Sequence, residues 1–229
     1  MSSASEPQTT LVNKAQAVFR LLADFYGIPE WRQPLPAIDE LISTILSQNT
    51  NDTNRDAAFN NLKARFKTWE EVRDAPVEAV QAAIRTAGLA NQKAPRMQAI
   101  LRRISAERGS LDLDFLKRLE RDEAHAWLSR FNGVGPKTAA IVLQFSLGIP
   151  AFPVDTHVYR VSGRLGLRPQ KMNVEKAHAW LEKVFKPEQY GPGHLNIIRL
   201  GREICHARSP ECARCPLTSL CDYFQGTNR

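Results

Sequence analysis

The segment Gly133-Val134-Gly135-Pro136-Lys137 places a lysine directly after a tight glycine turn. Proline suits the first position of a helix, so Lys137 is expected in that helix's first turn. Gly133 and Gly135 let backbone amides approach a ligand closely, and a helix N-terminus carries partial positive charge. An ordinary helical hairpin also uses turn glycines. The segment nevertheless favours a phosphate site, with Lys137 as a phosphate contact or as a nucleophile beside a sugar–phosphate backbone.

The chain after this helix is expected to bring a carboxylate, that of Asp155, back near Lys137. A helix over residues 136–147 carries the chain about 18 Å at roughly 1.5 Å per residue. The extended residues 148–154 can span about 23 Å at roughly 3.3 Å each. Asp155 can therefore lie near Lys137, and it precedes a helical segment that it can also cap. His157 is expected to pack or cap on that helix.

A lysine and an aspartate beside a phosphate suit one reaction in particular. A neutral amine can attack the anomeric carbon of a deoxyribose and form a Schiff base. The carboxylate can take the amine's proton or stabilise positive charge on the sugar. This chemistry is a hypothesis that the spacing alone leaves beside simple phosphate binding.

All four cysteines lie near the C-terminus, at Cys205, Cys212, Cys215 and Cys221. Such clustering favours metal ligation over disulfides in a reducing compartment. Four thiolates can hold one tetrahedral zinc ion or one iron–sulfur cubane. Zinc sites usually show two short cysteine pairs, and only one pair is short here. The loop between the first two cysteines carries His206 and Arg208, which can meet a phosphate or simply face solvent.

Composition narrows the class of partner. The chain has 229 residues, 43% of them hydrophobic, with a formal net charge of +7 and a pI near 9.4. Such a charge favours a polyanionic partner. The sequence shows no apolar run long enough to span a membrane and no signal peptide, so we expect an intracellular protein.

The apolar periodicity is helical almost throughout, which predicts an all-α fold. Thr68 and Glu71 form an expected capping box. Helices are expected over or near residues 11–25, 38–46, 57–66, 77–88, 97–104, 122–130, 136–147, 156–166, 173–184 and 193–204, with a further short helix that opens at Thr68.

Three patterns together resemble one known family. They are Gly-Val-Gly-Pro-Lys-Thr-Ala at residues 133–139, Val-Asp-Thr-His at residues 154–157, and the Cys-x6-Cys-x2-Cys-x5-Cys spacing. From about Thr10 to Cys221 the chain resembles endonuclease III, a helix-hairpin-helix DNA glycosylase. The resemblance implies that Lys137 is the Schiff-base nucleophile, that Asp155 assists it, and that the four cysteines hold one 4Fe-4S cluster.

The resemblance also implies the architecture and the partner. A six-helix domain over residues 37–148 would lie beside a cluster domain of residues 10–36 and 149–222, with disordered tails at 1–9 and 223–229. Duplex DNA carrying a damaged base or an AP site would bind across the cleft between the domains, with that base flipped out. We expect a cytoplasmic monomer, nucleoid-associated if the organism is bacterial.

Two loops correspond to the family's wedge loops, which enter the gap left by a flipped base. Gln48 and Asn49 lie in the gap-filling loop, and Leu89 lies where a leucine faces the opposite strand. An amide can replace lost base hydrogen bonds, and an apolar side chain can prop open a base stack. A polar turn and a helix-end packing contact are the structural alternatives.

The chain also departs from the family pattern. Phe131-Asn132 stands where many members have Leu-Pro, Ser129 replaces a glutamate of close relatives, and the gap-filling glutamine is Asn49 or is shifted to Gln48. These departures bear on lesion range more than on the reaction. The sequence leaves two alternatives to a bifunctional glycosylase/AP lyase for damaged pyrimidines: an adenine or mismatch glycosylase, and a non-catalytic DNA-binding metalloprotein.

Overall fold

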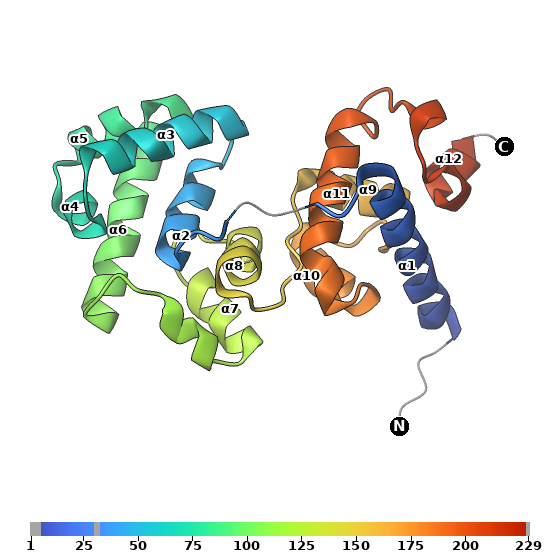
Figure 1. Cartoon of the computed structure of the whole chain (residues 1–229), viewed down its shortest axis with the longest axis horizontal. Coiled ribbons are helices and arrows are strands. Elements are labelled where there is room, and N and C mark those ends of the chain that lie inside the picture. The colour runs from blue at the N-terminus through green and yellow to red at the C-terminus, as the bar shows by residue number, and fades with distance from the viewer. Residues whose placement is uncertain (1–5, 30–32, 228–229) are drawn as a thin grey trace. The chain divides into compact units, whose positions relative to one another are not determined.

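The structure is a computed structural model that describes residues 6–29 and 33–227. These residues form twelve α-helices with short 3-10 and π turns and contain no strand (Figure 1). The expected all-α class is therefore confirmed. Contacts divide the chain into two units, Pro34–Ile149 and Met1–Gln33 with Pro150–Arg229.

The unit Pro34–Ile149 is built around α2 (Ala37–Leu46), all ten residues of which are buried. A helix that is buried on every face must be surrounded by other elements, although α2 also carries the polar residues Asp39, Glu40, Ser43 and Thr44. It packs against α3, α6 and α8. The remaining helices of this unit are α3 (Asp52–Arg65), α4 (Trp69–Asp74), α5 (Val77–Ala83), α6 (Ala90–Arg108), α7 (Arg121–Ser129) and α8 (Pro136–Val142).

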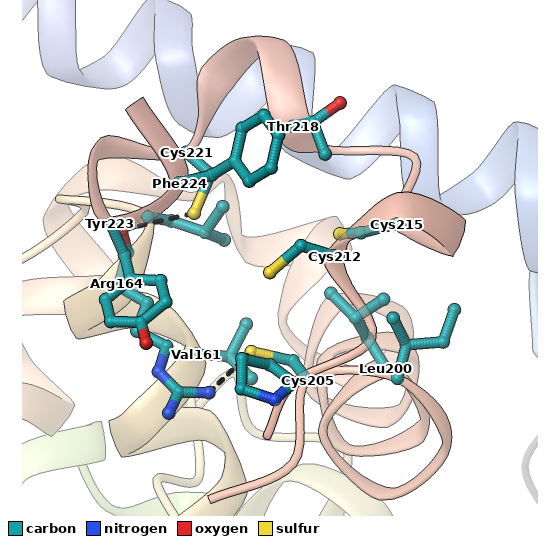
Figure 2. A pocket seen from close by; sticks show the side chains of 13 residues that line it. Val161, Arg164, Leu200, Cys205, Cys212, Cys215, Thr218, Cys221, Tyr223 and Phe224 are labelled. Atoms are coloured by element: carbon teal, nitrogen blue, oxygen red, sulfur yellow. Dashed lines mark hydrogen bonds between the residues drawn. The ribbon is translucent and has the colours of Figure 1, made fainter. Parts of the chain in front are cut away.

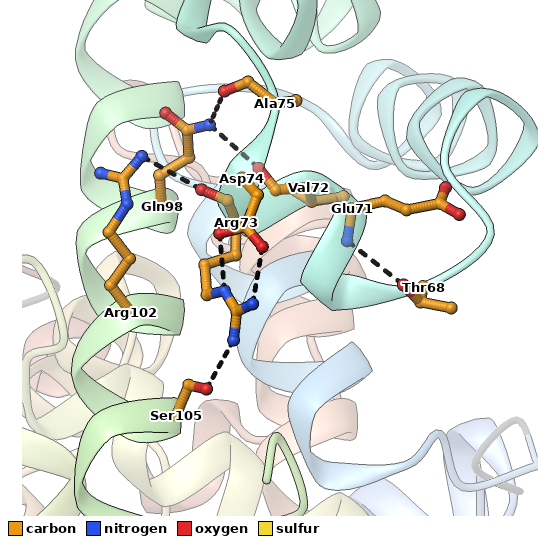
Figure 3. A network of polar contacts seen from close by, with 9 residues as sticks. All are labelled: Thr68, Glu71, Val72, Arg73, Asp74, Ala75, Gln98, Arg102 and Ser105. Atoms are coloured by element: carbon orange, nitrogen blue, oxygen red, sulfur yellow. Dashed lines mark hydrogen bonds and ion pairs between the residues drawn. The ribbon is translucent and has the colours of Figure 1, made fainter. Parts of the chain in front are cut away.

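Polar side chains of α6 fasten the short helix α4 to it (Figure 3). The amide of Gln98, 2% exposed, donates to the carbonyls of Val72 (2.9 Å) and Ala75 (2.7 Å). Arg73 donates to the Ser105 hydroxyl at 2.6 Å. A helix of six residues is too short to be stable alone, so these bonds and its buried apolar face hold it in place.

The other unit has one apolar core that joins the N-terminal helix to the C-terminal third of the chain. Fully buried Leu22 and Phe152 belong to this core together with Leu181 and Leu200. The helices of this unit are α1 (Glu6–Tyr26), α9 (Thr156–Arg164), α10 (Val174–Val184), α11 (Tyr190–Glu203) and α12 (Asp222–Thr227).

The chain ends differ from the sequence prediction. Residues 6–9 belong to α1 and residues 223–227 to α12, where disordered tails were expected; residues 1–5 and 228–229 lie outside the described residues. The reason for order at the C-terminal end is tertiary. The Tyr223 ring lies 4.8 Å from the Arg164 guanidinium, and Tyr223 and Phe224 line a pocket together with Val161 and Leu200.

Two local details also differ. The Thr68 hydroxyl accepts from the Glu71 amide as expected, but the Glu71 carboxylate reaches back to the Lys67 amide at 2.7 Å, one residue beyond the expected partner. The helix expected over 136–147 changes from α to π at Leu143–Leu147. Its end is closed by Gly148 at φ +69°, with the Ile149 amide on the Leu143 carbonyl.

Candidate functional site

A tight turn joins α7 to α8 and presents backbone amides. The Val134 amide closes the turn on the Phe131 carbonyl at 3.0 Å, and Pro136 begins α8. Within the described residues, the amides of Gly133, Gly135, Lys137 and Thr138 donate to no acceptor. Free amides at a helix N-terminus form a ready anion site. The predicted phosphate cradle is therefore available for a ligand.

The two glycines of this turn are required for different reasons. Gly133 has φ +87°, and a Cβ there would lie 2.2 Å from the Arg96 side chain. Gly135 has an ordinary φ of −88°, and a Cβ there would meet nothing within 4 Å. The fold itself thus requires only the first glycine. The second leaves open space beside the free amides, as close approach of a ligand backbone would need.

Lys137 lies in the first turn of α8 and is half-buried. In the part of the chain that the structure describes, its ammonium makes no hydrogen bond or ion pair. A lysine held in this way at an anion site is free to contact a bound ligand.

The unusual residues before the turn have separate roles. Phe131 is buried, and its ring packs edge-on against Trp127 at 4.9 Å with the Arg103 guanidinium 5.3 Å from its centroid. Asn132 is exposed, and the Ser129 hydroxyl lies 3.4 Å from His125 Nδ1. The aromatic packing holds Phe131, whose carbonyl accepts the bond that closes the turn.

Asp155 caps α9, as the sequence predicts. Its carboxylate accepts from the Val158 amide at 2.7 Å. The buried segment before it is held by side chains of α10 and α11: His178 bonds to the Phe152 carbonyl (3.1 Å), Glu182 to the Phe152 amide (3.0 Å), and His194 to the Pro153 carbonyl (2.9 Å). The Asp155 carboxylate is therefore fixed in its own unit. Its pairing with Lys137, which belongs to the other unit, stays a prediction.

His157, the second residue of α9, packs as expected. Its Nδ1 lies 3.1 Å from the Arg160 guanidinium, and its ring lies against Gly201 of α11, where a Cβ would come within 2.9 Å. The side chain is therefore part of the packing between α9 and α11.

Each of the two predicted wedge loops contains a residue with left-handed backbone. Asn49 is exposed at φ +54°, and Leu89 is 43% exposed at φ +50°. Asparagine tolerates such a φ, but for an apolar side chain such as Leu89 it is strained, and strained residues cluster at functional sites. Gln48 instead donates to the Gly133 carbonyl at 2.9 Å. Of the two amides, Asn49 is thus the one displayed to solvent.

The four cysteine side chains surround one pocket, as Figure 2 shows. Its other walls are mainly apolar and come from α9 and α11, including Val161, Leu165, Leu200 and Ile204. Within the described residues no three His, Cys, Asp or Glu side chains are grouped closely enough to hold a single metal ion. Four thiols around one mainly apolar pocket are the donor set that a 4Fe-4S cluster takes.

Burial raises the pKa of two of the four cysteine thiols. Desolvation raises the pKa of the Cys215 and Cys221 thiols, and the neighbouring cysteines raise it further. Thiols of raised pKa are protonated at neutral pH, so iron binding must displace their protons.

Two arginines that the sequence analysis missed hold the first cysteine loop. Arg164 donates to Cys205 Sγ (3.3 Å) and to the His206 carbonyl (2.6 Å), and Arg160 donates to the Cys205 carbonyl (3.1 Å). His206 Nε2 is engaged with Glu211 at 3.2 Å. Arg208 is exposed and makes no hydrogen bond or ion pair with any described residue. Of the two expected DNA contacts in this loop, Arg208 is the available one.

Comparison with known proteins agrees with this geometry. Residues 42–187 match the model of the HhH-GPD superfamily of base excision DNA repair proteins, and residues 205–221 match that of the iron–sulfur binding domain of endonuclease III. Endonuclease III of Thermotoga maritima is 35% identical over 81% of this chain and 82% of its own length. A candidate DNA glycosylase of Arabidopsis thaliana is 41% identical over 66% of this chain, a match that spans only 52% of the plant protein.

A solved structure of a trapped endonuclease III–DNA covalent intermediate has the same fold, with a TM-score of 0.81 and 28% identity over 95% of this chain and 99% of that one. The chain therefore belongs to the HhH-GPD superfamily of base excision DNA repair proteins and, within it, to the endonuclease III family of DNA glycosylases. None of the helices that the structure describes is both long and apolar enough to cross a membrane.

Proposed function

We propose that this protein is a bifunctional DNA glycosylase and AP lyase that removes oxidised or otherwise damaged pyrimidines from duplex DNA. The observation that carries the proposal is the Lys137 amine. It lies without a partner among the described residues, in the first turn of a helix whose N-terminal amides are free. The covalent intermediate trapped for a structural relative supports the same chemistry.

The reaction uses Lys137 Nζ as a neutral amine that attacks C1′ of the damaged nucleotide. The new C–N bond forms as the glycosidic bond breaks, and the base leaves with the bonding electron pair and takes up a proton. The sugar ring opens to a protonated Schiff base. Removal of a C2′ proton then expels the 3′ phosphate with the C3′–O electron pair, which nicks the strand. Water hydrolyses the imine and regenerates the lysine.

Asp155 assists by accepting the amine's proton or by stabilising the positive charge that develops on the sugar. One carboxylate oxygen caps α9, and the other makes no hydrogen bond within the described residues. Cap and catalytic assistance are therefore compatible roles for one side chain.

The cofactor in this proposal is one 4Fe-4S cluster ligated by Cys205, Cys212, Cys215 and Cys221. When bound, the cluster supplies a structural cross-link among these cysteines. The apolar walls of the pocket exclude water from it, and Arg164 donates a hydrogen bond to the first ligand sulfur.

The decisive experiment uses a duplex with one oxidised pyrimidine, treated with the protein and borohydride. Borohydride reduces the imine to a stable amine, so a covalent protein–DNA adduct is expected. In samples with protein but without borohydride, base release and a nick are expected. Release of adenine without a nick would favour the mismatch-glycosylase alternative. Binding to this duplex without base release, together with binding to a duplex with an AP site without a nick, would show a non-catalytic protein.

Binding to duplex DNA is expected to weaken steeply with salt. Each phosphate neutralised by Lys or Arg releases a counterion, so log K should fall with log salt at about −0.9 per phosphate contact. Fluorescence anisotropy from low to physiological salt measures this slope. A DNA affinity that does not change with salt would contradict a DNA partner.

We also expect the protein to act as a monomer in the cytoplasm.

Leu89 is expected to trade stability for activity. Leu89→Gly relieves the left-handed strain, so the free energy of unfolding should be unchanged or raised by up to about 1 kcal/mol. The same change removes the apolar wedge, and single-turnover base excision should slow by about tenfold or more. Leu89→Met, which keeps the apolar bulk, is the control. Equal excision rates of the glycine variant and the wild type would show that Leu89 does not act as a wedge.

A further inference from the structure

Lys93 of α6 is a fully buried lysine, 2% exposed, that the reaction does not use. Its ammonium donates to the carbonyls of Leu46 and Ala87, each at 2.8 Å. These two carbonyls end the elements that precede the two wedge loops: Leu46 ends α2, and Ala87 ends the 3-10 turn Arg85–Ala87. One side chain thus joins two loops that are about forty residues apart in sequence.

At the end of α2, Lys93 satisfies a carbonyl that the helix itself leaves open. The last four carbonyls of a helix have no partner within it. Here the other three bond to the backbone or side chain of Ser47 or Gln48, the acceptors being Ser43, Thr44 and Ile45. The Leu46 carbonyl depends on Lys93.

Lys93 holds the second wedge loop at two points. Its side chain binds the Ala87 carbonyl, and its backbone amide donates to the Leu89 carbonyl at 2.9 Å. The strained conformation of Leu89 lies between these two bonds. A left-handed apolar residue persists only where its surroundings fix it. The Leu89 carbonyl also accepts from the Gln92 amide at 2.9 Å, so the contribution specific to lysine is the bond from its side chain to the Ala87 carbonyl.

The hairpin is connected to the same arrangement through Gln48. The Gln48 amide donates to the Gly133 carbonyl at 2.9 Å, and its oxygen accepts from the Arg96 guanidinium at 3.4 Å. The Arg96 side chain passes directly beneath Gly133, where no Cβ stands in its way. Lys93 and Arg96 both project from the first turns of α6.

We propose that Lys93, with Gln48, is a positioning device that couples the three DNA-facing loops: residues 47–51, residues 88–89 and the hairpin 131–135. The coupling rests on the proposed function for its purpose. Two wedges that enter one gap in a duplex must keep their separation, and the phosphate cradle must hold the strand at a fixed distance from both. A single buried cation bonded to both loop stems maintains that separation.

The chemistry of the lysine explains why an apolar side chain cannot substitute for it. Loss of the ammonium leaves two buried carbonyls without donors, and an unsatisfied buried acceptor is costly. Desolvation, with the nearby Arg96 charge, lowers the pKa of Lys93, which means that the surroundings disfavour the charged ammonium. The hydrogen bonds to the Leu46 and Ala87 carbonyls offset this cost.

Helix α6 offers a matched control for the test. Gln98, also 2% exposed, donates to two carbonyls as well, but these belong to α4 and its C-cap rather than to a DNA-facing loop. Lys93→Met and Gln98→Met therefore each remove a buried donor of two carbonyl bonds. Hydrogen exchange of the full-length protein is compared among these two variants and the wild type.

Lys93→Met is expected to raise amide exchange in residues 47–51 and 88–89 together, at least tenfold above wild type, whereas Gln98→Met should raise it around residues 70–76. Faster exchange in one loop alone, or an equal pattern in both variants, would overturn the coupling. If Lys93→Met does not fold, Gln48→Ala serves instead, with faster exchange expected in residues 131–135 and no change there contradicting the proposal. These readouts need no DNA, so they remain valid if the proposed function fails.

Once the wild type has been shown to form the trapped adduct, excision kinetics of the variants test the purpose of the coupling. Lys93→Met should slow single-turnover excision by about 10- to 100-fold, the scale of a misplacement near 1 Å. In a Leu89→Gly background the same change should have less than half of that effect on a logarithmic scale, because the loop that it positions has lost its wedge. Additive effects would show that Lys93 does not act through Leu89.

Discussion

Lys137→Gln is expected to abolish the borohydride-trapped adduct and to lower the rate of strand cleavage by about a thousand-fold or more, the scale on which loss of a covalent nucleophile acts. Glutamine keeps most of the length and polarity of the side chain but cannot form an imine. The side chain is half-buried and has no partner among the described residues, so the free energy of unfolding should change by less than about 0.5 kcal/mol. DNA affinity should fall by no more than one phosphate contact would supply.

Asp155→Asn is the matched control for this experiment. Asparagine caps a helix as well as aspartate does, so α9 should keep its N-terminal bond to Val158. Only the carboxylate charge is lost. The adduct should still form, but more slowly, because the lysine has lost its proton acceptor. An adduct that persists at the wild-type rate in Lys137→Gln would show that another amine, or the N-terminus, is the nucleophile.

Features that depend on neighbours in sequence could be predicted from the sequence. Helix ends at Gly27, Gly148 and Gly166 follow from the low cost of positive φ at glycine, and all three have it. The Asp155 cap and the Pro136 start of α8 follow from local hydrogen bonding in the same way. The cysteine pocket was predicted because metal ligands leave a spacing that few other structures need.

Features that depend on tertiary contacts could not be predicted. Nothing in the sequence around Lys93 distinguishes a buried lysine from the usual exposed one, and its two acceptors lie in other elements. Arg164 looks like an ordinary basic residue at the end of a helix until its bonds to the cysteine loop are seen. The sequence also cannot distinguish Gln48 from Asn49, because both amides suit a gap-filling role. The tertiary bond from Gln48 to the Gly133 carbonyl shows that the Gln48 amide is already engaged.

Cys212→Ser is expected to remove the broad visible absorption of the purified protein and to destabilise its C-terminal segment. Residues 205–227 contain only two three-residue 3-10 turns and the six-residue helix α12. Three of the four cysteines pack against the core of their unit, so the pocket itself is part of that core. A segment with so little secondary structure depends on its metal for stability, as small metal-bound domains do.

The loss should reach several kcal/mol, which for a chain of this size lowers the melting temperature by on the order of 10 °C. Thr218→Val, which alters the pocket wall without removing a thiol, is the control and should keep both colour and stability. Elemental analysis of the wild type should give four irons with inorganic sulfide per chain. One zinc per chain in a colourless, stable protein would contradict the cluster.

The two substitutions affect separate properties, which makes them informative together. Lys137→Gln should remove chemistry from a protein that keeps its colour, its stability and its salt-dependent DNA binding. Cys212→Ser should lose colour and stability first, and DNA binding with them, because the exposed Arg208 lies in the loop that begins at the first ligand, Cys205. A cysteine variant that stays folded and colourless and still forms the adduct would show that catalysis does not need the cluster, and Arg208 would then have to contact DNA from a loop held by Arg164 and Arg160 alone.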